Sequence, residues 1–77
     1  MQKQNYVTLE TSEVIRGKYV RLSELMDTED RPFVVAVYVT NREKTQVSML
    51  QAIRLGELLY AQELFDRLVW RLHHDCN

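Results

Sequence analysis

The segment Phe33–Thr40 constrains the fold more than any other part of the chain. Its sequence, FVVAVYVT, is rich in β-branched and aromatic residues and directly follows a proline, which predicts a strand. Alternate residues of a strand face opposite sides. One face carries Val34, Ala36 and Tyr38, and the other carries Phe33, Val35, Val37 and Val39. Both faces are apolar, so we expect each to be covered, either by flanking segments or by a second copy of the chain.

The N-terminal half predicts two shorter strands. Apolar residues alternate with polar or amphipathic ones in Tyr6–Glu10 and again in Lys18–Leu22. The segment Thr11–Gly17 between them permits either one helical turn or a turn between two strands, and the sequence does not decide between them. Ser23 can cap a further helical turn, and the polar run Asp27–Pro32 predicts a surface loop.

The C-terminal half carries an apolar stripe at helical spacing. Thr40 and Glu43 have the spacing of a capping box, so we expect a helix to begin there and to reach about His73. The stripe consists of Val47, Leu50, Ile53, Leu58, Ala61, Leu64, Phe65, Leu68, Val69 and Leu72. Gly56 could interrupt this helix. We favour one continuous helix, because residues 55–57 offer no Ser, Thr, Asn or Asp that could cap a second one.

These elements predict an α+β fold, with a small antiparallel sheet of two or three strands followed by one long C-terminal helix. We expect residues 1–77 to form a single domain, because 77 residues are too few for two cores. A domain of this size lies near the limit of independent stability and often gains stability by self-association. A second apolar seam, formed by Ala52, Leu55, Leu59 and Trp70, would remain beside the main stripe.

Composition argues against several classes of protein. The ten basic and eleven acidic residues are interspersed, so the chain lacks the basic excess of proteins that coat nucleic acid, although a local basic patch is possible. The single cysteine excludes an internal disulfide, which suits a reducing cytoplasm. We expect a protein that is neither exported nor membrane-spanning, because no secretory apolar segment and no stretch of about 18 apolar residues is present.

No group of residues predicts chemistry. His73, His74, Asp75 and Cys76 are all metal-ligand types, but only His73 and Cys76 have suitable spacing and no second pair exists. We therefore expect no catalytic residue, no metal and no cofactor. Arg54 and Glu57 would form an i, i+3 ion pair on the apolar face of the helix, where such a pair favours specificity over stability. The alternative is that the helix twists or ends locally and both side chains reach water.

The preferred hypothesis is a non-enzymatic regulatory or adaptor protein that binds a protein partner and is itself a homodimer. A hetero-oligomer would explain the surplus apolar surface equally well. The predicted interface residues are Leu55, Leu59, Trp70, Val34 and Tyr38.

The alternative hypothesis is a sequence-specific DNA-binding regulator. An apolar strand followed by helical sequence, from about Phe33 to Leu72, loosely resembles the ribbon–helix–helix repressors. This resemblance implies a dimer that places paired strands in the major groove. That family has basic or polar residues on the outward strand face, where this chain has Val34, Ala36 and Tyr38, so we rank this hypothesis second.

Overall fold

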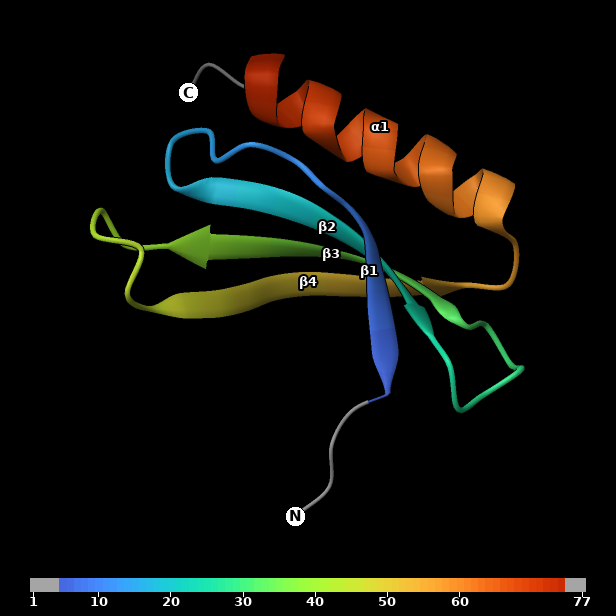
Figure 1. The fold of residues 1–77 in the computed structure, drawn as a ribbon. Coiled ribbons are helices and arrows are strands. Elements are labelled where there is room, and N and C mark those ends of the chain that lie inside the picture. Colours follow the sequence, from blue (N-terminus) through green and yellow to red (C-terminus); the bar gives the residue numbers. More distant parts are fainter. Residues whose placement is uncertain (1–4, 75–77) are drawn as a thin grey trace.

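The computed structural model describes residues 5–74, which form one antiparallel sheet and one helix (Figure 1). The elements are β1 (Tyr6–Thr11), β2 (Lys18–Leu25), β3 (Phe33–Thr40), β4 (Val47–Leu55) and α1 (Leu58–His74). The strands lie in the order β1-β2-β3-β4, so each strand pairs with its neighbour in the chain. The predicted α+β class is confirmed, with four strands instead of two or three.

The connection between β1 and β2 is a tight turn between strands. Arg16 and Gly17 both have positive φ angles, of 52° and 79°, as a two-residue hairpin turn requires. Ile15 and Lys18 on either side exchange two backbone hydrogen bonds, of 2.8 and 3.0 Å. The second of the two alternatives for Thr11–Gly17 is therefore correct, and no helical turn forms there.

β2 is longer than expected, because it continues through Ser23 to Leu25. Ser23 pairs with Val34 of β3, so it does not cap a helical turn. The predicted loop after this strand is confirmed, and β3 has the bounds that the sequence predicted.

The expected capping box at Thr40–Glu43 is wrong, because these residues lead into a hairpin loop. The Thr40 hydroxyl donates to the carbonyl oxygen of Gln46 at 3.0 Å, which joins the two ends of the loop. The Asn41 side-chain oxygen accepts hydrogen bonds from the amides of Thr45 and Gln46 at 2.9 and 3.2 Å. An asparagine that satisfies loop amides in this way stabilises a turn, so the chain reverses here.

Residues 47–55 form β4, so the prediction of a helix over this segment is wrong. The register with β3 shifts by one residue, since Val37 pairs with Gln51 while Tyr38 pairs with Met49. Leu50 is therefore the extra residue of a β-bulge. The bulge reverses the alternation, which turns Met49 to the face of Tyr38 and Ile53 to the face of Val35.

The helix begins only after Gly56, so the expectation of one uninterrupted helix is also wrong. Its first hydrogen bond runs from the Ala61 amide to the Glu57 carbonyl at 3.1 Å. Glu57 thus occupies the N-cap position, which a Ser, Thr, Asn or Asp would usually fill. The absence of such a residue did not prevent the break, because packing on the sheet fixes where α1 starts.

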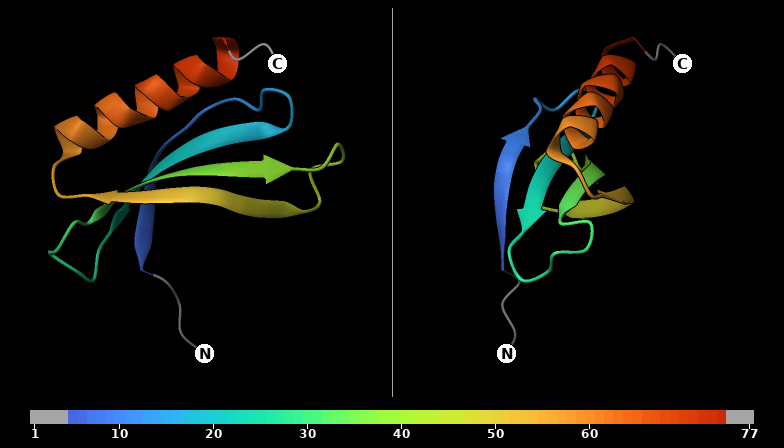
Figure 2. Two further views of the ribbon diagram at one scale, coloured as in Figure 1. Left: turned by 180° about the vertical axis from the view of Figure 1, so that it is seen from behind. Right: turned by 90° about the vertical axis from the view of Figure 1, so that its right-hand side faces the viewer.

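The core lies between α1 and one face of the sheet, the helix face. Val20, Leu22 and Val35 from the sheet meet Ala61 and Phe65 from the helix, and each is at most 5% exposed. Phe33, Val37, Leu55, Leu64, Leu68, Val69 and Leu72 pack round them. The helix packs mainly on β2, less on β3 and β4, and not on β1. It runs along one face of the sheet (Figure 2).

No helix of residues 5–74 covers the opposite face of the sheet, here called the open face. Its central residues are nevertheless covered, since Ala36 is 2% and Tyr38 9% exposed. Tyr19 stacks on Tyr38 with ring centroids 5.1 Å apart, and the Arg21 guanidinium lies 4.7 Å from the centroid of the Tyr38 ring. Neighbouring strands thus supply part of the second cover expected for the central strand.

None of the helices in residues 5–74 has the length and apolar character needed to cross a membrane.

Candidate functional site

A hollow in the described surface lies between the C-terminal half of α1 and the strands beneath it. It has a volume of about 570 Å³. Its lining residues are Lys18, Val37, Leu50, Gln51, Leu68, Trp70, Arg71, Leu72 and His74. We call it the α1–β4 groove. Its volume falls within the range of small-molecule and peptide-segment sites in proteins.

The groove exists because α1 and β4 diverge. The helix starts beside the end of β4 and runs diagonally toward the turn between β1 and β2 (Figure 1). At its far end His73 lies 3.7 Å from Glu13 of that turn, measured between Nε2 and Oε2. The start of β4 is therefore left without a helix above it, and Leu50 remains 55% exposed.

Trp70 forms the aromatic wall of the groove. Its ring stacks on His74, one helical turn further on, with centroids 4.2 Å apart and planes 15° apart. The His74 Nδ1 atom also lies 2.8 Å from the Trp70 carbonyl oxygen. The stack holds the indole in place, while 59% of Trp70 stays exposed. A fixed and exposed tryptophan is typical of residues that anchor protein interfaces.

The charge of the groove is positive. Lys18 and Arg71 line it, and no aspartate or glutamate of residues 5–74 does. Neither of these two side chains forms an ion pair with any of residues 5–74. The groove thus combines apolar residues with two cations whose charge is not balanced by the described part of the chain.

The groove adjoins an unpaired edge of the sheet. β4 pairs only with β3, so its outer backbone groups have no strand partner within residues 5–74. Residues 47–53 read VSMLQAI and contain neither a charge nor a proline. Natural sheets usually protect edges with charged residues, proline or short strands, and β4 has only its bulge at Leu50 and Arg54 near its end. Such an edge is suited to pairing with an added strand.

The structure separates Leu55, Leu59 and Trp70, the three residues of the predicted seam that were assigned to an interface. Leu55 belongs to β4 and packs against the core. Leu59 and Trp70 lie on one side of α1, about 16 Å apart along its axis, at 61% and 59% exposure. Glu63 and Asp66 fall between them on that side, so the expected continuous apolar ridge does not form. Only Trp70 of the three lines the groove.

Val34 and Tyr38, the other two predicted interface residues, project from β3 onto the open face. Val34 is half-buried beside Arg54, its partner across the strands. Tyr38 is almost covered by Tyr19 and Arg21. The structure therefore places these two residues on the side of the sheet away from Trp70, and their role in an interface stays a prediction.

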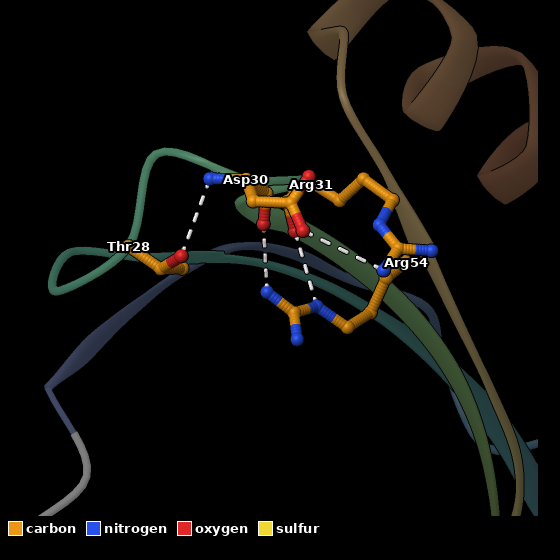
Figure 3. A network of polar contacts seen from close by, with 4 residues as sticks. All are labelled: Thr28, Asp30, Arg31 and Arg54. Carbon is orange, nitrogen blue, oxygen red and sulfur yellow. Dashed lines mark hydrogen bonds and ion pairs between the residues drawn. The ribbon is translucent and has the colours of Figure 1, made fainter.

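Arg54 and Glu57 do not form the expected pair on one helix, because Arg54 lies in β4 and Glu57 precedes α1. The Arg54 guanidinium reaches the β2–β3 loop instead, where it donates to the carbonyl oxygens of Asp30 at 2.8 Å and Arg31 at 3.1 Å (Figure 3). Arg31 has a positive φ of 48°, which arginine rarely adopts. Arg54 thus holds a strained loop against the sheet.

The candidate metal ligands of the C-terminal segment do not form a site among the described residues. Asp75 and Cys76 lie outside the described residues. Within residues 5–74 no three His, Cys, Asp or Glu side chains are placed to share a metal ion. The groove contains one imidazole, of His74, and the sequence analysis missed the groove residues Lys18 and Arg71. The position of Arg71 directly after Trp70 was no signal for a shared site, because consecutive helical residues point about 100° apart.

Comparisons of the chain with protein-family models, with curated proteins and with solved structures find no match. The geometry of the groove and of the β4 edge is therefore the basis for a proposal about function.

Proposed function

We propose that the chain is a non-enzymatic interaction protein, of the regulatory or adaptor type, that binds a protein partner at the β4 edge and in the α1–β4 groove. One observation carries this proposal. An edge strand whose residues 47–53 carry no charge lies next to a groove that holds the chain's only tryptophan, and most of that tryptophan is exposed.

The edge favours an extended segment of the partner. A strand added to β4 would satisfy its outer backbone groups, and alternate side chains of that strand would face the groove. The other edge of the sheet, β1, is less suited to such pairing. Its register with β2 shifts between Thr8 and Glu10, and Glu10 places a charge in the strand.

The charge of the groove favours an acidic partner. Lys18 and Arg71 can pair with carboxylates, whereas Leu50, Leu68 and Leu72 can pack against apolar side chains. A segment that alternates apolar and acidic residues meets both requirements. A second copy of β4 would not, because its only charged residue is Arg54.

A homodimer formed through paired β4 strands is the second candidate. The absence of charge in residues 47–53 favours it, because two copies would meet at this edge without repulsion. Sedimentation equilibrium at micromolar concentration separates the two candidates. A dimer that Met49→Lys converts to a monomer supports the second, whereas a 9.2 kDa monomer leaves the edge free for a different protein.

The experiment that tests the main proposal is selection from a random 16-residue peptide library displayed on phage. We expect the recovered peptides to alternate apolar and acidic residues and to shift the Trp70 emission to shorter wavelength on binding. Arg71→Glu should abolish binding, while Arg42→Glu in the exposed β3–β4 loop should retain it. Failure to recover any peptide above background, or equal loss in both variants, would refute the proposal.

A further inference from the structure

A second surface, independent of the groove, lies on the open face of β1, β2 and β3. Three tyrosines and one arginine meet there, and we call them the Tyr–Arg cluster: Tyr6, Tyr19, Arg21 and Tyr38. The Arg21 guanidinium lies between two rings, 5.7 Å from the Tyr6 centroid and 4.7 Å from the Tyr38 centroid. It also donates a hydrogen bond of 2.6 Å to the Tyr38 hydroxyl.

Among residues 5–74, the cation of this cluster has no carboxylate partner. A guanidinium has five N–H donors, and the only hydrogen bond of Arg21 to a described side chain is that to Tyr38. The register places Glu10 and Glu24 on the helix face, beside Leu22 and Phe33. None of the strand residues on the open face is acidic. The open face is therefore locally basic although the whole chain has a net charge of −1.

A shallow pocket adjoins the cluster. It has a volume of about 290 Å³ and is lined by Thr8, Thr11, Ser12, Val14, Tyr19 and Arg21. The two threonine hydroxyls can donate or accept hydrogen bonds at its wall. This volume is close to the lower limit for small-molecule sites, so the pocket suits one ring-sized group rather than a large ligand.

We propose that the open face binds single-stranded nucleic acid. Arg21 pairs with a backbone phosphate, a base stacks on the half-buried Tyr19, and the hydroxyls of the adjacent pocket hydrogen-bond the base or sugar. Aromatic rings beside a cation on a sheet suit single strands, because unpaired bases expose their ring faces and a duplex hides them. The near-neutral net charge does not oppose this site, because Glu10 and Glu24 face the other side of the sheet and Glu13 pairs with His73.

Two other occupants fit less well. A second copy of the chain packed on this face would bury Arg21 without an anion, which is costly, and the strands it brings carry no acid on their own open face. An acidic peptide would supply the anion, but it would supply a ring to stack on Tyr19 only where it carries an aromatic side chain. Single-stranded nucleic acid supplies a phosphate and a ring in every nucleotide.

The test is fluorescence anisotropy with a labelled 12-nucleotide thymidine strand, the matching uridine strand and a duplex of the same length. We expect a single strand to bind at low salt and the duplex to bind at least tenfold more weakly. The affinity should fall with salt on a log–log slope of about −0.7 per phosphate contact. Tyr19→Ala should weaken binding about 5- to 150-fold, the effect of losing one stacked base, while Tyr19→Phe retains it.

The matched control is Tyr60→Ala, which removes a 56% exposed tyrosine from α1 and should leave binding unchanged. Circular dichroism of each variant reports whether it is folded. The proposal is overturned if neither single strand binds at low salt, if Tyr19→Ala and Tyr60→Ala have equal effects, or if polyglutamate competes as well as unlabelled thymidine strand. None of these outcomes depends on the α1–β4 groove.

Discussion

Replacing Phe65 by alanine tests whether α1 is held by its contact with the sheet. Phe65 is 5% exposed and packs among Val20, Leu22 and Val35. Removing a buried phenylalanine usually costs about 3 to 5 kcal/mol, from lost burial and from the cavity left behind. A domain of 77 residues has a total stability of about 4 to 12 kcal/mol. Phe65→Ala should therefore remove a large share of the stability of the fold.

Urea unfolding followed by far-ultraviolet circular dichroism measures this loss. The matched control is Leu59→Ala, one and a half turns earlier on α1, where the side chain is 61% exposed. Its effect should stay within about 0.5 kcal/mol. A loss below about 1 kcal/mol for Phe65→Ala, or equal losses for the two variants, would show that α1 does not pack on the sheet as described.

The remaining predictions concern the two glycines and the hydrogen bonds that Arg54 donates to the β2–β3 loop. Gly17→Ala should cost about 1 to 2 kcal/mol, since φ is +79° and a Cβ would lie 3.2 Å from the Thr40 carbonyl oxygen. Gly56→Ala should be neutral or slightly stabilising, as no atom lies within 4 Å of an added Cβ; similar melting temperatures for both glycine variants would contradict this difference. Arg54→Ala should cost about 1 kcal/mol through the lost loop hydrogen bonds, whereas Glu57→Gln should cost less than about 0.5 kcal/mol. Equal urea midpoints for Arg54→Ala and Glu57→Gln would contradict this and would support an ion pair between the two side chains.

The strand part of the fold could be predicted because its signals are local. Phe33–Thr40 consists of strand-forming residues, and its neighbours alternate in the N-terminal half. The second cover for this strand could not be predicted in detail. It depends on Arg21 and Tyr19 meeting Tyr38 across paired strands, and one-dimensional periodicity does not show cross-strand contacts.

The segment 47–55 was misread because a bulge hides its alternation. Val47, Leu50 and Ile53 recur every three residues, which imitates a helix, while Met49 and Ile53 have opposite orientations only because Leu50 is bulged. The extra residue breaks the period of two in the middle of the strand. Gly56 was the remaining local signal for a boundary between two elements. The sequence interpretation gave more weight to the lack of a capping side chain and therefore continued the helix across Gly56.

The candidate site was predicted in part. Trp70 was selected for its surplus apolar surface and lies in the groove wall. Lys18 and Leu50 were missed because they reach the groove from strands far apart in sequence, through a sheet order that the sequence analysis did not contain. The charge of the site likewise arises from the meeting of Lys18 and Arg71, which the near-zero net charge conceals.

Amide hydrogen exchange, measured by NMR on the free chain and on its complex with a selected peptide, tests the central claim most directly. The claim is that a partner segment pairs with the edge of β4. Residues 48–53 should then gain protection at the amides that point away from β3, because the added strand accepts their hydrogen bonds. Amides of β1, at the opposite edge, should be unchanged. Protection confined to β1, or a complex that leaves residues 48–53 unprotected, would contradict the account.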